Sequence, residues 1–262
     1  MNGDSIEWPK ISVVTPTYNQ SGYIEATIRS VLDQEYPNLE YIIMDGGSTD
    51  GTVEIIEKYS EHLAHWVSEP DGGQTDALIK GFDRASGDIL CWLNSDDLFE
   101  ACVLQSVARL FTQYPDWQLV YGDFLAIDAD GCPLTIKREI PYYRFIWMYD
   151  HDYIPQSSAF WRRGIYEEVG GLDAKMSLAM DADLFARFAE RTTPHHVRRV
   201  WSRFRYHPEA KTARLRTKMD EEDALIRSRY LPDEAPWLRR SKRLLAKCIR
   251  ATLKFPRVVT YW

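Results

Sequence analysis

The chain has 262 residues, of which 45% are hydrophobic and 27% charged, so its composition excludes disordered and fibrous proteins and allows one large α/β domain with an appendage. The formal net charge is −7, but eight of the 32 Lys and Arg residues lie from Arg239 onward, where no acidic residue occurs. Residues 1–238 therefore hold 24 basic and 39 acidic residues, a net charge of −15, which excludes a general nucleic-acid-binding surface and suits a site for metal cations.

The four cysteines are scattered and lack the paired spacing of a structural zinc site. One of them, Cys91, stands in an apolar run and is interpreted as a small buried hydrophobic residue. The first ten residues carry Asp4 and Glu7 and do not resemble a signal peptide, and no window approaches the ~20 apolar residues of a membrane span. We therefore expect a cytoplasmic protein, either free or attached peripherally to the cytoplasmic face of a membrane.

Short β-branched runs alternate with helical patterns through the first half of the chain, which is typical of a parallel sheet with crossover helices. Strands are predicted at residues 11–15, where Pro16 ends the strand, and at 39–45, 64–68 and 88–93. Helices are predicted at about 21–34, 52–60 and 74–85.

The second half has a more mixed pattern. It predicts a helix at 101–114, strands at 119–124 and 125–128, a hairpin turn at Asp130-Gly131, a strand at 157–161 and a helix at 181–191. Pro232 and Pro236 separate a final helix at 237–254. The predicted organisation is a catalytic domain over residues 1–212 and a helical, basic tail over residues 213–262.

Polar residues follow each predicted strand of the first half. Ligands of open parallel sheets bind beyond the carboxyl ends of the strands, so these residues are candidates for a binding site. They are 15–18, Asp45, 69–74 and 94–97.

Asp96 and Asp97 are adjacent at the end of a strand, where a cation such as Mg²⁺ or Mn²⁺ commonly offsets the repulsion of two carboxylates. The alternative is that Asp97 caps the helix that follows. The pairs Gly46-Gly47 and Gly72-Gly73 match no phosphate-binding fingerprint and are interpreted as tight turns.

Three runs in this order resemble the family 2 glycosyltransferases: Ser12-Val-Val-Thr-Pro-Thr-Tyr-Asn19, Asp45-Gly-Gly-Ser-Thr-Asp-Gly-Thr52 and Trp92-Leu-Asn-Ser-Asp-Asp97. The resemblance covers about residues 10–207. It implies an α/β fold of the GT-A type, with a Rossmann-like, mostly parallel central sheet flanked by helices and, in this chain, a C-terminal helical extension. It also implies a nucleotide-sugar-binding half at about 10–98 and an acceptor half at about 99–212.

The resemblance further implies an inverting enzyme that moves one sugar from a nucleoside diphosphate sugar, with a UDP-sugar as the default, to a glycan or lipid-linked acceptor. The donor would be bound by Thr15, Pro16, Tyr18, Asp45, Gln74, Asp76 and Asp96. Mn²⁺ or Mg²⁺ would be held by Asp96, Asp97 and His207. For His207 the alternative is an ordinary surface histidine.

Asp181 occupies the position of the family's catalytic base, which removes the proton from the acceptor hydroxyl. The alternatives are that Asp181 caps the following helix or that Asp183 is the base. The sequence departs from the family pattern at Asn94, where an acidic residue is usual, and at Met180, which precedes the base. It also lacks a Gln-x-x-Arg-Trp run, so a processive polysaccharide synthase is not expected.

Two other functions remain open from the sequence. A nucleotidyltransferase also places carboxylates and metal at strand ends, but it normally needs a basic Gly-rich loop, and residues 15–19 contain neither Gly nor Lys. A non-catalytic nucleotide- or glycan-binding module would not require the catalytic carboxylates.

The predicted tail helix is amphipathic. One face carries Leu238, Leu245, Cys248, Ile249, Thr252 and Leu253, and basic residues cover most of the remainder. Such a helix can bind an anionic membrane surface, with Phe255, Tyr261 and Trp262 at headgroup depth. The alternative is that the basic helix packs on the acidic catalytic domain.

Overall fold

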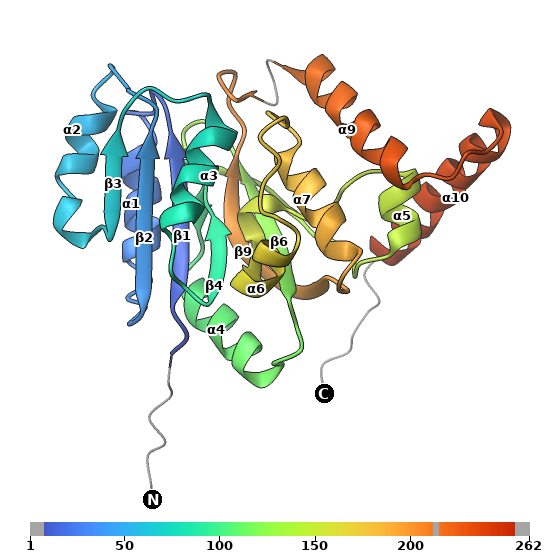
Figure 1. The fold of residues 1–262 in the computed structure, drawn as a ribbon, viewed down its shortest axis with the longest axis horizontal. Helices are drawn as coiled ribbons and strands as arrows, with labels where there is room; N and C mark the ends of the chain where they lie inside the picture. The colour runs from blue at the N-terminus through green and yellow to red at the C-terminus, as the bar shows by residue number, and fades with distance from the viewer. Residues whose placement is uncertain (1–7, 212–214, 255–262) are drawn as a thin grey trace, which may run out of the picture.

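The computed structural model describes residues 8–211 and 215–254, and its centre is a nine-stranded sheet (Figure 1). The strands lie in the order β3-β2-β1-β4-β8-β6-β9-β5, and β7 pairs with β6 outside this path. Their bounds are β1 Ile11–Thr17, β2 Leu39–Asp45, β3 His65–Ser68, β4 Ile89–Trp92, β5 Leu98–Phe99, β6 Leu119–Ile127, β7 Pro133–Lys137, β8 Ala159–Arg162 and β9 His195–Arg205.

The first four strands form the parallel half of the sheet. β1 lies between β2 and β4, and β2 pairs with β3, all in parallel register. The crossover helices between them are α1 Ile24–Leu32, α2 Thr52–Glu57 and α3 Gln74–Arg84, with a short 3-10 turn at Ser60–His62. The predicted α/β fold with helices flanking a central sheet is confirmed.

Helices cover both faces of this parallel half, which explains why β1, β2 and β4 are largely buried. Successive side chains of a strand point to opposite faces, so Ile11 and Val13 of β1 pack with α1 and α2 while Val14 packs with α3. The helix α3 lies close to β1, because a Cβ on Gly81 would stand 2.5 Å from Cγ1 of Val14. The carboxyl ends of β1–β4 are therefore fixed by packing on both sides.

The second half of the sheet is mixed. β8 is antiparallel to β4 and β6, β5 to β9, and β7 to β6, whereas β6 and β9 are parallel. The mostly parallel arrangement thus holds for β1–β4 and not for the later strands. The remaining elements are α4 Val103–Gln113, α5 Arg144–Tyr149, the 3-10 turn η2 Gln156–Ser158, α6 Arg163–Glu168, α7 Met180–Ala189, α9 Arg216–Tyr230 and α10 Pro236–Lys254.

Several predicted boundaries are wrong. Pro16 does not end the first strand but lies within β1, opposite Met44. The pairing of β1 with β4 stops at Val14, so one edge of β1 is open at Pro16, where a missing N–H is tolerated. Helix α1 begins at Ile24, three residues after the predicted start at residue 21, because residues 21–23 form a turn.

The predicted strands at 119–124 and 125–128 are one strand, β6. Its first part pairs with β8 and its last part with β7, while β9 lies along its other edge. The pairing partner changes along β6, and the register shifts near Asp123. Both irregularities interrupt the alternation of apolar and polar side chains that would mark a continuous strand in the sequence. The strand β9 was not predicted. It contains six Arg and His residues, and these, with the same register shifts, hide the apolar alternation expected of a strand.

The C-terminal elements are two helices, α9 and α10, of which α10 packs against α5 (Figure 1). The predicted tail helix is therefore confirmed, and its start moves by one residue to Pro236. The predicted boundary between catalytic domain and tail falls at residues 212–214, outside the described residues. No described helix is both long and apolar enough to span a membrane.

Candidate active site

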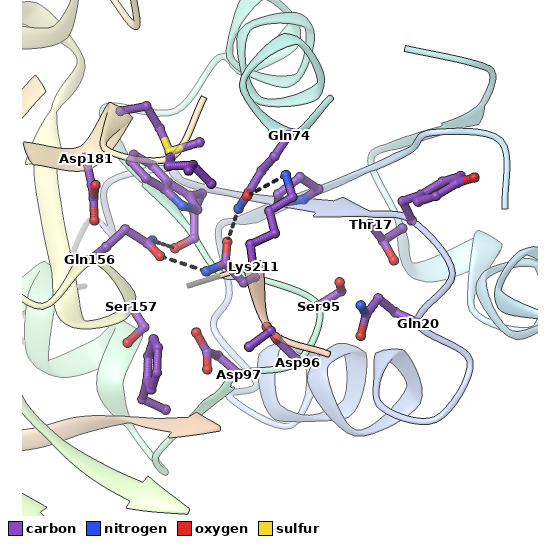
Figure 2. Close-up of a pocket in the computed structure, with 18 of the residues that line it drawn as sticks. Thr17, Gln20, Gln74, Ser95, Asp96, Asp97, Gln156, Ser157, Asp181 and Lys211 are labelled. Carbon is purple, nitrogen blue, oxygen red and sulfur yellow. Dashed lines mark hydrogen bonds between the residues drawn. The ribbon is translucent and has the colours of Figure 1, made fainter. Parts of the chain in front are cut away.

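A cavity of about 1480 Å³ lies at the carboxyl ends of β1–β4 and extends to the start of α7 and to α9 (Figure 2). Binding pockets for one small ligand commonly enclose about 300–1,000 Å³. The cavity therefore has room for two substrates. In the view of Figure 2, Thr17 and Gln20 lie on one side and Asp181 on the other.

Most of the site residues predicted from the sequence meet in this cavity. Seven line it: Pro16, Tyr18, Gln74, Asp96, Asp97, Asp181 and His207. The other three, Thr15, Asp45 and Asp76, are not among the lining residues.

Asp45 is only 2% exposed and organises the loop after β2. Its Oδ2 accepts hydrogen bonds from the backbone N–H groups of Gly47 and Ser48, at 3.1 and 2.9 Å. Ser68 Oγ donates to the same oxygen at 2.6 Å, and Ser48 Oγ donates to Oδ1. Both carboxylate oxygens thus hold the loop after β2 and the neighbouring Ser68 in place.

Thr15 and Asp76 also have structural partners. The Thr15 hydroxyl lies 3.1 Å from the Tyr41 hydroxyl in the core. Asp76 accepts a hydrogen bond from the N–H of Gly72 at 2.9 Å and forms an ion pair with Lys80 at 3.1 Å. Thr15 thus connects β1 to β2, and Asp76 holds the loop before α3.

The two carboxylates after β4 differ in their surroundings. Asp97 is 1% exposed; its Oδ1 accepts the backbone N–H of Arg205 at 3.0 Å, while its Oδ2 is buried without a hydrogen-bond partner in the described structure. Burial, together with the neighbouring charge of Asp96, raises the pKa of Asp97 well above its usual range. Helix α4 begins six residues later, with Cys102 as its N-cap, so the interpretation of Asp97 as a helix cap is wrong.

His207 joins this pair. Its Nε2 lies 3.0 Å from Oδ2 of Asp96, and its ring packs against Tyr23 with centroids 4.9 Å apart. The predicted proximity of the histidine to the carboxylates is thus seen, and the surface alternative is wrong because His207 is only 6% exposed.

The sequence predicts that these three side chains hold a divalent cation. Within residues 8–211 and 215–254, no three His, Cys, Asp or Glu side chains are already arranged as a metal-binding set. Carboxylate oxygens are nevertheless the preferred ligands of Mg²⁺ and Mn²⁺, and imidazole is a further ligand of transition metals. The buried, unpartnered Oδ2 of Asp97 beside Asp96 is an acceptor that a cation would satisfy.

A chain of hydrogen bonds connects four segments that are far apart in sequence (Figure 2). Gln74 at the start of α3 donates to Oδ1 of Asn94 at 2.8 Å, and Asn94 donates to Oε1 of Gln156 at 3.2 Å. Gln156 donates to the carbonyl of Trp92 at 2.7 Å, and Lys211 Nζ donates to Oε1 of Gln74 at 3.2 Å. Asn94, which replaces the usual acidic residue, thus positions neutral amides in the centre of the cavity.

Lys211 was not singled out from the sequence. It is the single Lys or Arg among the described lining residues. Burial lowers its pKa. The lining carboxylates are far more numerous: Asp50, Asp71, Asp96, Asp97, Asp152, Asp181, Glu209, Asp220 and Asp223.

Asp181 lies in the first turn of α7, and its Oδ1 accepts the N–H of Ala182 at 2.9 Å. The N-cap residue is Ala179, but the Asp181 side chain still accepts a first-turn N–H of α7, so the capping alternative holds in part. Burial raises the pKa of Asp181 to about 6. Asp152 also lines the cavity, and burial with the charge of Asp181 raises its pKa to about 7.

Asp183, the rival for the catalytic base, does not line the cavity. It is fully buried and forms ion pairs with Arg187 at 2.7 Å and Arg229 at 2.6 Å. Both of its oxygens are therefore engaged, and it connects α7 to α9.

The model of the family described as glycosyl transferase family 2 matches residues 12–170. The chain belongs to this family. An uncharacterized glycosyltransferase of Mycobacterium tuberculosis is 30% identical over 200 residues, which cover 75% of each chain. The chain is thus a glycosyltransferase.

Two solved structures have similar folds. The S. aureus TarS fragment 1–349, in complex with UDP-GlcNAc, superimposes with a TM-score of 0.67 at 18% identity, over 93% of this chain and 71% of that chain. The mannosyltransferase PcManGT of Pyrobaculum calidifontis, in complex with GDP-Man and Mn²⁺, gives a TM-score of 0.66 at 20% identity, over 92% and 70%. These similarities support the predicted GT-A type of fold.

Proposed function

We propose that this glycosyltransferase is an inverting, non-processive enzyme that moves one sugar from a UDP-sugar to a hydroxyl group of a glycan or lipid-linked acceptor. The observation that carries the proposal is that Asp181 lines the same cavity as Asp96 and Asp97, and that this cavity has room for donor and acceptor together. The nucleotide complexes of TarS and PcManGT support a nucleoside diphosphate sugar as donor.

In the proposed reaction, the acceptor hydroxyl attacks the anomeric carbon of the donor from the face opposite the diphosphate. The new bond from oxygen to carbon forms as the bond between the anomeric carbon and the diphosphate oxygen breaks, which inverts the configuration. Asp181 accepts the hydroxyl proton. The raised pKa of Asp181 fits this role, because a base with a pKa of about 6 is ionised at neutral pH and binds a proton more strongly than an exposed carboxylate.

The departing diphosphate gains negative charge, which the acidic cavity cannot offset by itself. Asp96, Asp97 and His207 would hold Mn²⁺ or Mg²⁺, and this cation supplies Lewis-acid stabilisation of the diphosphate when bound. The Mn²⁺ complex of PcManGT supports this assignment. Lys211 would donate to the same diphosphate, since it is the single Lys or Arg among the described lining residues.

Replacing Lys211 by Met is expected to weaken UDP binding about 10- to 100-fold, because a charge-assisted hydrogen bond contributes about 1.5–3 kcal/mol. Lys211→Arg should retain part of the affinity. The matched control is Lys218→Met, which removes an exposed charge from α9 outside the cavity lining. The measurement is the calorimetric Kd of UDP with Mn²⁺. Equal affinity of Lys211→Met and the parent enzyme would refute the contact.

The pH dependence follows from the pKa of Asp181. The base must be deprotonated to accept the hydroxyl proton, so kcat is expected to rise with pH through about 6 and to level off above it. The measurement is kcat at saturating donor between pH 5 and pH 8. A profile that falls over this interval would contradict Asp181 as the base.

Nucleotide-sugar binding and consumption test the proposal as a whole. We expect UDP and UDP-sugars to raise the melting temperature in the presence of Mn²⁺, because a ligand that binds only the folded state stabilises it. Consumption of the sugar nucleotide should release the nucleoside diphosphate. Binding without consumption by any acceptor, water included, would indicate a binding module. Release of pyrophosphate from a nucleoside triphosphate incubated with a sugar 1-phosphate would indicate a nucleotidyltransferase.

A further inference from the structure

Helix α10 presents one face to the rest of the molecule. Ala246 is fully buried, and Leu253 packs against the core on the α7 side of the sheet. Three basic residues connect this face to α5 and the segments beside it: Lys242 donates to the Tyr149 hydroxyl at 3.1 Å, Arg250 pairs with Asp150 at 2.5 Å, and Lys254 pairs with Glu139 at 2.8 Å. The alternative that the basic helix packs on the acidic domain is therefore correct for this face.

The opposite face of α10 is apolar and exposed. Trp237 is 70% exposed, Leu244 60% and Leu245 54%. Cys248 and Thr252 continue the same face at helical spacing and are also exposed. The single apolar face predicted from the sequence is thus divided, because Leu253 packs inward while Leu245 points to solvent. Phe255, Tyr261 and Trp262, which the sequence adds to this surface, lie outside the described residues.

Basic residues border the exposed apolar face along one side. By helical period, Arg240, Arg243 and Lys247 lie beside Trp237 and Leu244. All three are exposed, and none forms an ion pair with any residue that the structure describes. No acidic residue occurs between residues 236 and 254. We call this set the α10 outer face: Trp237, Arg240, Arg243, Leu244, Leu245 and Lys247.

We propose that the α10 outer face binds an anionic membrane surface. Exposed Trp and Leu side chains can enter the boundary between headgroups and acyl chains while the adjacent Arg and Lys contact lipid phosphates. A second copy of this chain fits less well, because a two-fold pairing of α10 would place basic residues against basic residues. The charge of this face thus favours a polyanionic surface over self-association.

The position of α9 connects this surface to the active site. Met219, Asp220 and Asp223 of α9 line the cavity, and α9 leads through residues 231–235 into α10 (Figure 1). Binding of α10 to a membrane would place the α9 side of the cavity near the lipid headgroups. With the proposed glycosyl transfer, on which this step rests, the acceptor is then a hydroxyl group carried by a membrane lipid.

The test is cosedimentation of the full chain with vesicles of phosphatidylcholine alone and of an equal mixture of phosphatidylcholine and phosphatidylglycerol. We expect binding to the mixed vesicles at low salt and little binding to phosphatidylcholine. The variant R240Q/R243Q/K247Q should lower the partition coefficient by up to about 100-fold, since each basic residue near an anionic surface contributes about 1 kcal/mol. Trp237→Ala with Leu244→Ala should also reduce binding.

The matched control is Lys58→Gln/Arg198→Gln/Arg199→Gln, which removes three exposed charges distant in sequence from α10 and should bind like the parent chain. The proposal is overturned if the parent chain stays in the supernatant with mixed vesicles at low salt, or if the two triple variants bind equally. It is also overturned if the α10 variants convert a dimer to a monomer without affecting vesicle binding. UDP affinity, measured alongside, tests the proposed function separately, because vesicle binding does not require donor binding.

Discussion

Asn in place of Asp181 is expected to lower kcat of sugar transfer by about 10²–10⁴-fold, the usual contribution of a general base, while the Kd of UDP stays unchanged. Asp181 is proposed to act on the acceptor hydroxyl, so its loss should affect the chemical step and not donor binding. Initial rates at saturating donor, together with calorimetric titration of UDP, measure the two effects separately.

Asp152→Asn is the matched control for this substitution, because Asp152 lines the same cavity and also has a raised pKa. We expect it to retain most of the turnover. If Asp152→Asn abolishes transfer and Asp181→Asn does not, the base has been assigned to the wrong carboxylate.

The Asp181→Asn variant should also fold well. The pKa of Asp181 is raised from 3.8 to about 6 on folding, so its contribution to stability is present below about pH 4 and is lost as the pH rises through about 6. At pH 7.5 the buried carboxylate therefore lowers stability relative to a neutral amide of the same shape. A melting temperature equal to or above that of the parent enzyme would show that the variant is folded and that its lower kcat does not come from unfolding.

Asp96→Asn and Asp97→Asn are each expected to weaken the Mn²⁺-dependent binding of UDP about 100-fold, because each would remove one of the proposed oxygen ligands of the cation. Binding of UDP without metal should change little. Asp233→Asn is the control, since it removes an exposed carboxylate from the linker before α10. Calorimetric titrations with and without Mn²⁺ give these constants, and unchanged Mn²⁺-dependent affinity in both site variants would remove the metal assignment.

The parallel half of the sheet was predictable because each of its strands and helices is marked by a short, continuous stretch of sequence. Each β-α unit of residues 11–93 carries an apolar strand followed by an amphipathic helix, and the polar residues at strand ends mark the edge where ligands bind. Asp96 and Asp97 were thus located in the cavity from their place after a strand, and Asp181 from the resemblance to the glycosyltransferase family.

The rest of the cavity depends on contacts between distant segments. The chain from Gln156 through Asn94 and Gln74 to Lys211 spans sequence separations of 62, 20 and 137 residues, which no local pattern reports. Asp152 and Lys211 lie outside the recognised motifs, and only folding brings them beside Asp181 and Gln74. The hydrogen bond from Ser68 to Asp45, across 23 residues, could not be predicted for the same reason.

The central claim is that the site transfers a sugar with inversion, and the anomer released by slow hydrolysis of an α-linked UDP-sugar tests it most directly. Parent enzyme, Mn²⁺ and a panel of UDP-sugars are followed by proton NMR before the free sugar equilibrates in solution. The account predicts that UDP and the β-anomer appear together, and that Asp181→Asn abolishes both. First appearance of the α-anomer, or equal release by Asp181→Asn, would contradict it.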